Sequence, residues 1–149
     1  MTAKEYLLQA QRLRKSMLSL QEQIDELRTQ AEGVKAIEYD RDRVQTSPRD
    51  VMSEAVTEIV ELEEQYGRRV VEYHKKYLLI EHQINELPNP DHVELLRLRY
   101  LEPDRRTGKL QSWQAIAAKT HRSFSRTTHL HGEALAAFRK EHMMKDSKQ

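Results

Sequence analysis

The residues with the most suggestive chemistry lie in one short stretch near the C-terminus, residues 123–129. Wound as a helix at about 100° per residue, this stretch places Ser125, Arg126 and His129 opposite its apolar residues. Thr128 lies at the border between the two sides. Arginine can bond guanine through two hydrogen bonds, hydroxyls can bond any base edge, and histidine can donate or accept. These four residues are therefore candidates for reading bases in a DNA groove.

Residues around this stretch could also hold the phosphates of a nucleic acid. Backbone amides at the start of a helix, together with its positive end, suit a phosphate oxygen. The candidate phosphate-contacting residues are Gln114, Lys119, Arg122, Ser123, Arg105, Arg106 and Lys109. The last three belong to segment 102–109, EPDRRTGK, which is equally well interpreted as a solvated loop without contact to DNA.

Two short helices around a tight turn should position these residues. Ser112 and Ser123 are suitable N-caps, because their hydroxyls can accept from the free amides of a first helical turn. The packing side of the second helix, residues 124–138, is expected to hold Phe124, Thr127, Leu130, His131, Ala134, Leu135 and Phe138. This arrangement is typical of a helix-turn-helix, whose second helix enters the major groove.

The N-terminal part of the chain, residues 1–87, favours long helices. Thr2-x-x-Glu5 is a capping-box pattern, so the first helix should begin almost at once. Its apolar seam runs in alternating steps of four and three from Tyr6 to Val34, which is about four heptads. A polar helix of this length needs a partner for its seam.

A second long helix should supply that partner. Ser47 and Pro48 are a suitable cap and first residue, and the new seam runs from Met52 through Val56 to Leu87. We expect the two helices to form an antiparallel helical hairpin, a coiled coil, within one chain. The alternative is that each helix pairs across a dimer.

The prolines at 88 and 90 should end the hairpin and begin a short helix, residues 90–101. Little of this helix is polar, so we expect it to be buried on two sides. Arg97 and Arg99 should face outward or pair with acidic residues. The fold class is therefore all-α: a hairpin over 1–87, a helix-turn-helix domain over 88–141, and a disordered tail over 142–149. The chain is polar after Phe138, so we expect it to fray from Arg139 onwards.

Composition supports long helices and indicates where a polyanion would bind. Charged residues make up 33% of the 149 residues and aromatics 6%, with only four glycines and four prolines. Residues 1–87 carry 13 Lys and Arg against 17 Asp and Glu, whereas residues 88–149 carry 12 against 7. The basic part thus coincides with the predicted helix-turn-helix, as phosphate contact requires.

Other kinds of chemistry are not expected. The chain has no cysteine, no secretory apolar core and no apolar run of membrane-spanning length, so we expect a cytoplasmic protein without a membrane partner. His129 and His131 point in different directions on a helix and cannot easily share a metal ion with His121. No phosphate loop or nucleophile elbow is visible, so neither a cofactor nor an enzymatic activity is predicted.

Several segments, taken in order, carry a family resemblance. They are Leu98-Arg99-Tyr100, Trp113 with Ile116-Ala117, and Leu130-His131 with Ala134-Leu135. Their order and spacing resemble the C-terminal helix-turn-helix of phage late-gene transcriptional regulators of the ArpU and RinA kind, which is similar to region 4 of bacterial sigma factors. The opening residues and the long helical N-terminal half resemble the same group. The resemblance implies base contacts by Ser125, Arg126 and His129.

The leading hypothesis is a sequence-specific DNA-binding transcriptional regulator encoded by a phage or prophage. Its expected partners are double-stranded DNA, RNA polymerase and a second copy of the chain, in the cytoplasm of a bacterial host. One alternative is a protein-binding module that docks on RNA polymerase. Another is a DNA-packaging component similar to a small terminase subunit.

Overall fold

The computed structural model describes residues 1–40 and 48–144, and every regular element within them is helical. The absence of strands from these two ranges confirms the all-α class. The elements are α1 (Ala3–Leu7), α2 (Gln9–Asp40), α3 (Pro48–Asn85), α4 (Pro90–Leu96), the π-helical turn η1 (Arg97–Leu101), α5 (Trp113–Lys119), α6 (Phe124–Phe138) and a second π-helical turn η2 (Arg139–Met143). The predicted cap Ser47 and the last five residues lie outside the described ranges.

The chain divides into two compact units. One unit is Leu13–Tyr73, and the other combines Met1–Arg12 with His74–Gln149. The expected division after residue 87 does not coincide with this boundary, because the first twelve residues and the end of α3 belong with the C-terminal helices. None of the described helices is both long enough and apolar enough to cross a membrane.

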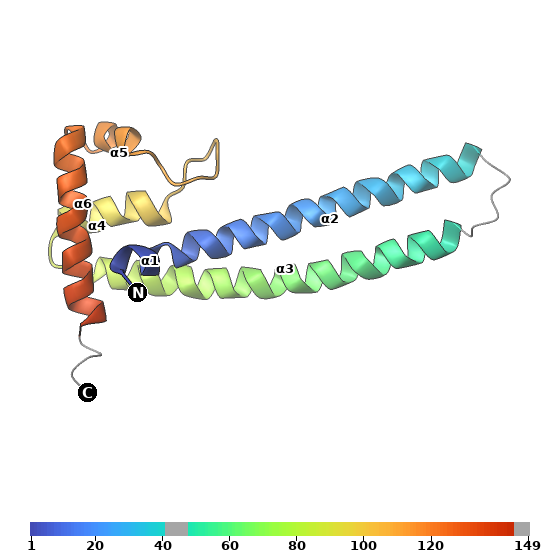
Figure 1. Cartoon of the computed structure of the whole chain (residues 1–149), viewed down its shortest axis with the longest axis horizontal. Helices are drawn as coiled ribbons and strands as arrows, with labels where there is room; N and C mark the ends of the chain where they lie inside the picture. Colours follow the sequence, from blue (N-terminus) through green and yellow to red (C-terminus); the bar gives the residue numbers. More distant parts are fainter. Residues whose placement is uncertain (41–47, 145–149) are drawn as a thin grey trace. The chain divides into compact units, whose positions relative to one another are not determined.

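In the unit Leu13–Tyr73, α2 and α3 run side by side in opposite directions (Figure 1). Ile24 of the first predicted seam is buried, and Arg28 on α2 forms an ion pair with Glu63 on α3. Val56, predicted to belong to the second seam, is instead 53% exposed.

In the other unit, the first helix begins with the predicted cap. The Thr2 hydroxyl accepts from the Glu5 amide at 3.1 Å, and the Glu5 carboxylate accepts from the Thr2 amide at 2.7 Å, which confirms the capping box. The first helix is not continuous, however, because a turn at Leu8 separates α1 from α2. Asn89 caps α4 by accepting from the Asp91 amide at 2.9 Å.

The core of this unit is formed where α4, α5 and α6 meet. Leu95, Ile116 and Leu130 contribute one buried side chain from each helix. Leu98 and Trp113 pack against this cluster and are partly buried. The three helices are thereby held together through apolar contacts, and α6 is buried along one side.

A second set of contacts joins α1 and the end of α3 to the C-terminal end of α6. The rings of Tyr6 and Phe138 lie 5.8 Å apart, and the Tyr6 hydroxyl donates to the Gln83 side-chain oxygen at 2.7 Å. His142 in η2 donates from Nε2 to the backbone carbonyl of Gln83 at 2.7 Å. The expectation that the chain frays after Phe138 is therefore wrong, because η2 continues the helix to Met143 and is held by these contacts.

The turn that joins α5 to α6 comprises residues 120–123. Ser112 and Ser123 cap the two helices as predicted, each hydroxyl accepting at 3.1 Å from the backbone amide three residues later. His121 has a φ of 55°, in the left-handed region that glycine favours, and the Arg122 amide returns to the Ala117 carbonyl at 3.0 Å. The sequence gives no signal for this conformation, because no glycine is present in the turn.

The left-handed conformation of His121 predicts that glycine at this position stabilises the protein. His121→Gly should raise the free energy of unfolding by about 0.5–1 kcal/mol. A side chain in this conformation costs about 1–2 kcal/mol, and the larger chain entropy that glycine loses on folding offsets part of this gain. The measurement is urea unfolding followed by circular dichroism. His121→Ala, which keeps the strain, is the control; equal gains in both variants would contradict the explanation.

Candidate nucleic-acid interface

The two sides of α6 differ sharply in burial. Its packing side holds Thr127, Leu130, Ala134 and Phe138, none more than 2% exposed. Ser125, Arg126 and His129 are exposed on its other side, and Thr128 at the border is half-buried. Phe124 was expected on the packing side and is 50% exposed instead, because it stands at the first turn of α6, beyond the reach of the core.

Short-range contacts already occupy some of these exposed groups. The Thr128 hydroxyl donates to the Ser125 carbonyl at 3.0 Å, and His129 Nε2 lies 3.1 Å from the Glu133 carboxylate, one turn further along. The Arg126 guanidinium forms no hydrogen bond or ion pair with any residue among 1–33 and 52–144, the side chains that the structure describes. Arg126 is therefore the exposed cation of α6 that is most available to a ligand.

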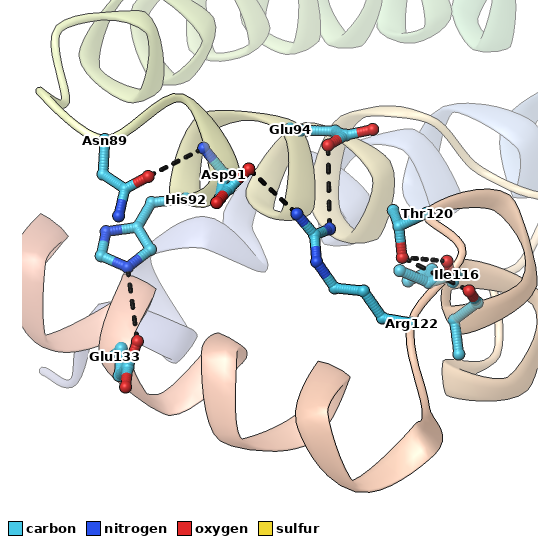
Figure 2. A network of polar contacts seen from close by, with 9 residues as sticks. Asn89, Asp91, His92, Glu94, Ile116, Thr120, Arg122 and Glu133 are labelled. Carbon is cyan, nitrogen blue, oxygen red and sulfur yellow. Dashed lines mark hydrogen bonds and ion pairs between the residues drawn. The ribbon is translucent and has the colours of Figure 1, made fainter.

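The predicted phosphate-contacting residues of α5 and the turn differ in whether their side chains already bind other residues of the protein. Arg122 is turned towards α4, where its guanidinium lies 2.9 Å from the Asp91 carboxylate and 3.8 Å from that of Glu94 (Figure 2). Its charge is thus compensated within the protein, so a phosphate would have to compete with two carboxylates. Lys119 donates to the Gln111 side chain at 2.8 Å, and Gln114 is exposed.

The loop 102–112 is shaped by its own hydrogen bonds. The Asp104 carboxylate accepts from the Arg106 amide at 2.7 Å and the Thr107 amide at 3.3 Å, and Gly108 adopts a φ of 69° to close the turn. A groove between this loop and α5 is lined in part by Glu102, Asp104, Arg105, Arg106 and Lys119. The three cations are brought together at this groove, and Lys109 is exposed on the loop.

An acidic residue limits the other end of the exposed side of α6. The Glu133 carboxylate lies close to two histidines. One is His129, and the other is His92 of α4, whose Nε2 is 3.8 Å from the carboxylate (Figure 2). The surface suited to an anion therefore extends over the first two turns of α6, from Ser123 to His129, and ends at Glu133.

A stack of polar and aromatic side chains supports α6 from behind. The Arg99 guanidinium lies 4.4 Å from the Trp113 ring centroid and donates to the backbone carbonyl of Gln111. The Trp113 and His131 rings are 4.4 Å apart, and the Tyr100 hydroxyl lies 2.8 Å from His131 Nε2. The prediction that Arg99 faces outward or pairs with an acid is therefore wrong, because a partly buried ring and a carbonyl provide its partners.

Burial determines the charge state of His131. It lowers the pKa of His131 to about 4, and the nearby charges of Arg99 and Lys4 act in the same direction. Nε2 of the neutral ring can accept a hydrogen bond from the Tyr100 hydroxyl. Burial also raises the pKa of Tyr100 to about 12. His131 was predicted to be a buried, hydrogen-bonded residue; it is half-buried and links η1 to α6.

The low pKa of His131 predicts a loss of stability in acid. As the pH falls from 6.5, the ordinary value, towards 4, the unfolded chain binds this proton before the folded protein does, so the free energy of unfolding decreases. The contribution of neutral His131 to the free energy of unfolding should be fully retained above pH 6.5. Urea unfolding of the wild type and His131→Gln across this range measures the difference, which should shrink as the pH falls; parallel pH profiles would contradict the assignment.

Neither a metal cluster nor a relative helps to define the site further. Among the described side chains, residues 1–33 and 52–144, no group of three His, Asp or Glu is arranged to hold a metal ion. Comparisons of the chain with protein-family models, with curated proteins and with solved structures found no match.

Proposed function

We propose that this chain is a DNA-binding transcriptional regulator in which α5, the turn 120–123 and α6 form a helix-turn-helix. The observation that carries the proposal is the exposure of Ser125, Arg126 and His129 on the side of α6 that the core leaves free. A helix of this width enters the major groove with its N-terminal residues towards the base edges. Resemblance to phage late-gene regulators and to sigma-factor region 4 supports the same conclusion.

The cations have different roles in this proposal. Arg126 has no partner among the described residues, and in this proposal it bonds a guanine. Arg105, Arg106 and Lys119 border one groove beside α5 and are suited to the phosphate backbone. Arg122 instead holds the turn against α4, so its loss should affect stability more than sequence preference.

The two long helices α2 and α3 complete the proposal as a hairpin that carries the helix-turn-helix. Their apolar seams and their ion pair between Arg28 and Glu63 support pairing within one chain. In a regulator, such a hairpin would dimerise the DNA-binding domain or present it to RNA polymerase. A homodimer would read two half-sites related by two-fold symmetry.

One observation favours the alternative of a protein-docking module. Phe124 is 50% exposed beside Arg126, and aromatic residues and arginine are enriched at protein interfaces. In that case Phe124→Ala would abolish binding to RNA polymerase while no duplex is bound in dilute buffer. Retained, sequence-dependent duplex binding by Phe124→Ala would favour the DNA-binding proposal.

The role of Arg126 is tested on duplexes selected from a random pool by the wild-type protein. Arg126→Ala should lose about 1–3 kcal/mol of discrimination at one position of the selected site, because one bidentate contact is removed. The measurement is a band-shift titration with duplexes carrying single base-pair changes.

Arg139→Ala is the matched control, because Arg139 is also exposed but lies in η2, beyond the C-terminal end of α6. It loses the same charge and should keep the full sequence profile. If Arg126→Ala keeps that profile as well, base reading by Arg126 is excluded.

A further inference from the structure

A second apolar stripe runs along α3, apart from the side that faces α2. Val60 and Val71 are 48% and 52% exposed, and Gly67 between them has open space above it. Wound at about 100° per residue, these three positions fall within roughly 40° of one another on the helix. All three belong to the unit Leu13–Tyr73. We call them the outer stripe.

A row of charges flanks the outer stripe at steps of seven residues. Along the single helix α3 the row is Glu54, Glu61, Arg68 and Lys75, two acids followed by two bases. All four are exposed, and none forms an ion pair with another residue among 1–33 and 52–144, the side chains that the structure describes. The spacing keeps them on one edge of the stripe, where coiled coils place the charges that select partner and orientation.

We propose that the outer stripe is a homodimer interface, on which α3 of a second copy packs antiparallel. In that orientation Glu61 lies beside Arg68 of the second copy, and Glu54 lies beside its Lys75. Both pairs share one midpoint, between residues 64 and 65, so a single two-fold axis pairs each of these four charges with one of opposite sign, although it also brings the two copies of Glu64 close together. A parallel pair would instead place acids beside acids at one end and bases beside bases at the other.

The same arrangement accounts for the apolar residues. Val60 of one copy meets Val71 of the other, so both are removed from water on association. Gly67 has no side chain and lets the two helix backbones approach near the axis. Because the charge row is complementary to itself, a second copy is the partner that fits, and the dimer does not depend on DNA binding.

The mass of the full chain in solution tests the dimer. Sedimentation velocity at rising concentration should approach twice the 17.7 kDa chain mass. Val60→Glu with Val71→Glu should remain at the monomer mass with unchanged helix content. Leu18→Glu, at a 40% exposed leucine of α2, is the matched control and should still dimerise. A wild type that stays monomeric, or a double variant that still dimerises, overturns the proposal.

The orientation is tested with single cysteines, since the chain has none of its own. Oxidation of a mixture of Val60→Cys and Val71→Cys should give the mixed disulfide. Each variant alone should not cross-link, because an antiparallel pair about this axis separates the two copies of residue 60 by about 14 Å, and those of residue 71 by about 20 Å, along the helix axis. Cross-linking of Val60→Cys alone, or no cross-link in the mixture, overturns the antiparallel arrangement even where the glutamate variants fail to fold.

The charge row leads to a third, independent prediction. Glu61→Arg and Arg68→Glu should each dimerise at least several-fold more weakly than the wild type, because like charges then face one another. An equimolar mixture of the two should form the heterodimer with wild-type strength. No gain on mixing would show that these charges do not meet.

Discussion

The burial of one side of α6 against α4 and α5 determines which of its residues remain free. Leu130 is 2% exposed and packs with Leu95 and Ile116, and fully burying such a side chain contributes about 1.5–3 kcal/mol. Any rotation of α6 about its axis would return this area to water. The contact that stabilises the domain therefore also leaves Ser125 and Arg126 exposed to solvent.

Polar groups fix the position of α6 more narrowly than the apolar core does. A guanidinium stacked on an indole contributes about 0.5–2 kcal/mol, and Arg99 on Trp113 also satisfies the loop carbonyl of Gln111. Tyr100 and His131 connect the same layer to α6 through a hydrogen bond. Because these groups come from η1, the loop and two helices, they hold the proposed reading helix in one register relative to its support.

Local signals in the sequence predicted the helix starts well, because a cap depends on residues only three positions apart. Thr2 with Glu5, Ser112 and Ser123 all behave as expected. The exposure of Phe124 and the stacking of Arg99 could not be predicted in this way. Helical periodicity assigns Phe124 to the packing side, but whether a neighbour reaches the first turn is a property of the tertiary fold. The partners of Arg99 lie more than ten residues along the chain, at a distance that no local pattern encodes.

The most direct measurement is a map of backbone amide chemical shifts of the full chain, recorded while a short selected duplex is added in dilute buffer. If α6 enters a groove, the largest changes should fall on Ser125, Arg126 and His129, with smaller changes at Arg105 and Lys119. The amides of the buried Ala134 and Phe138 should move little. Changes confined to α2 and α3, or no change at saturating duplex, would contradict the assignment of α6 as a DNA-reading helix.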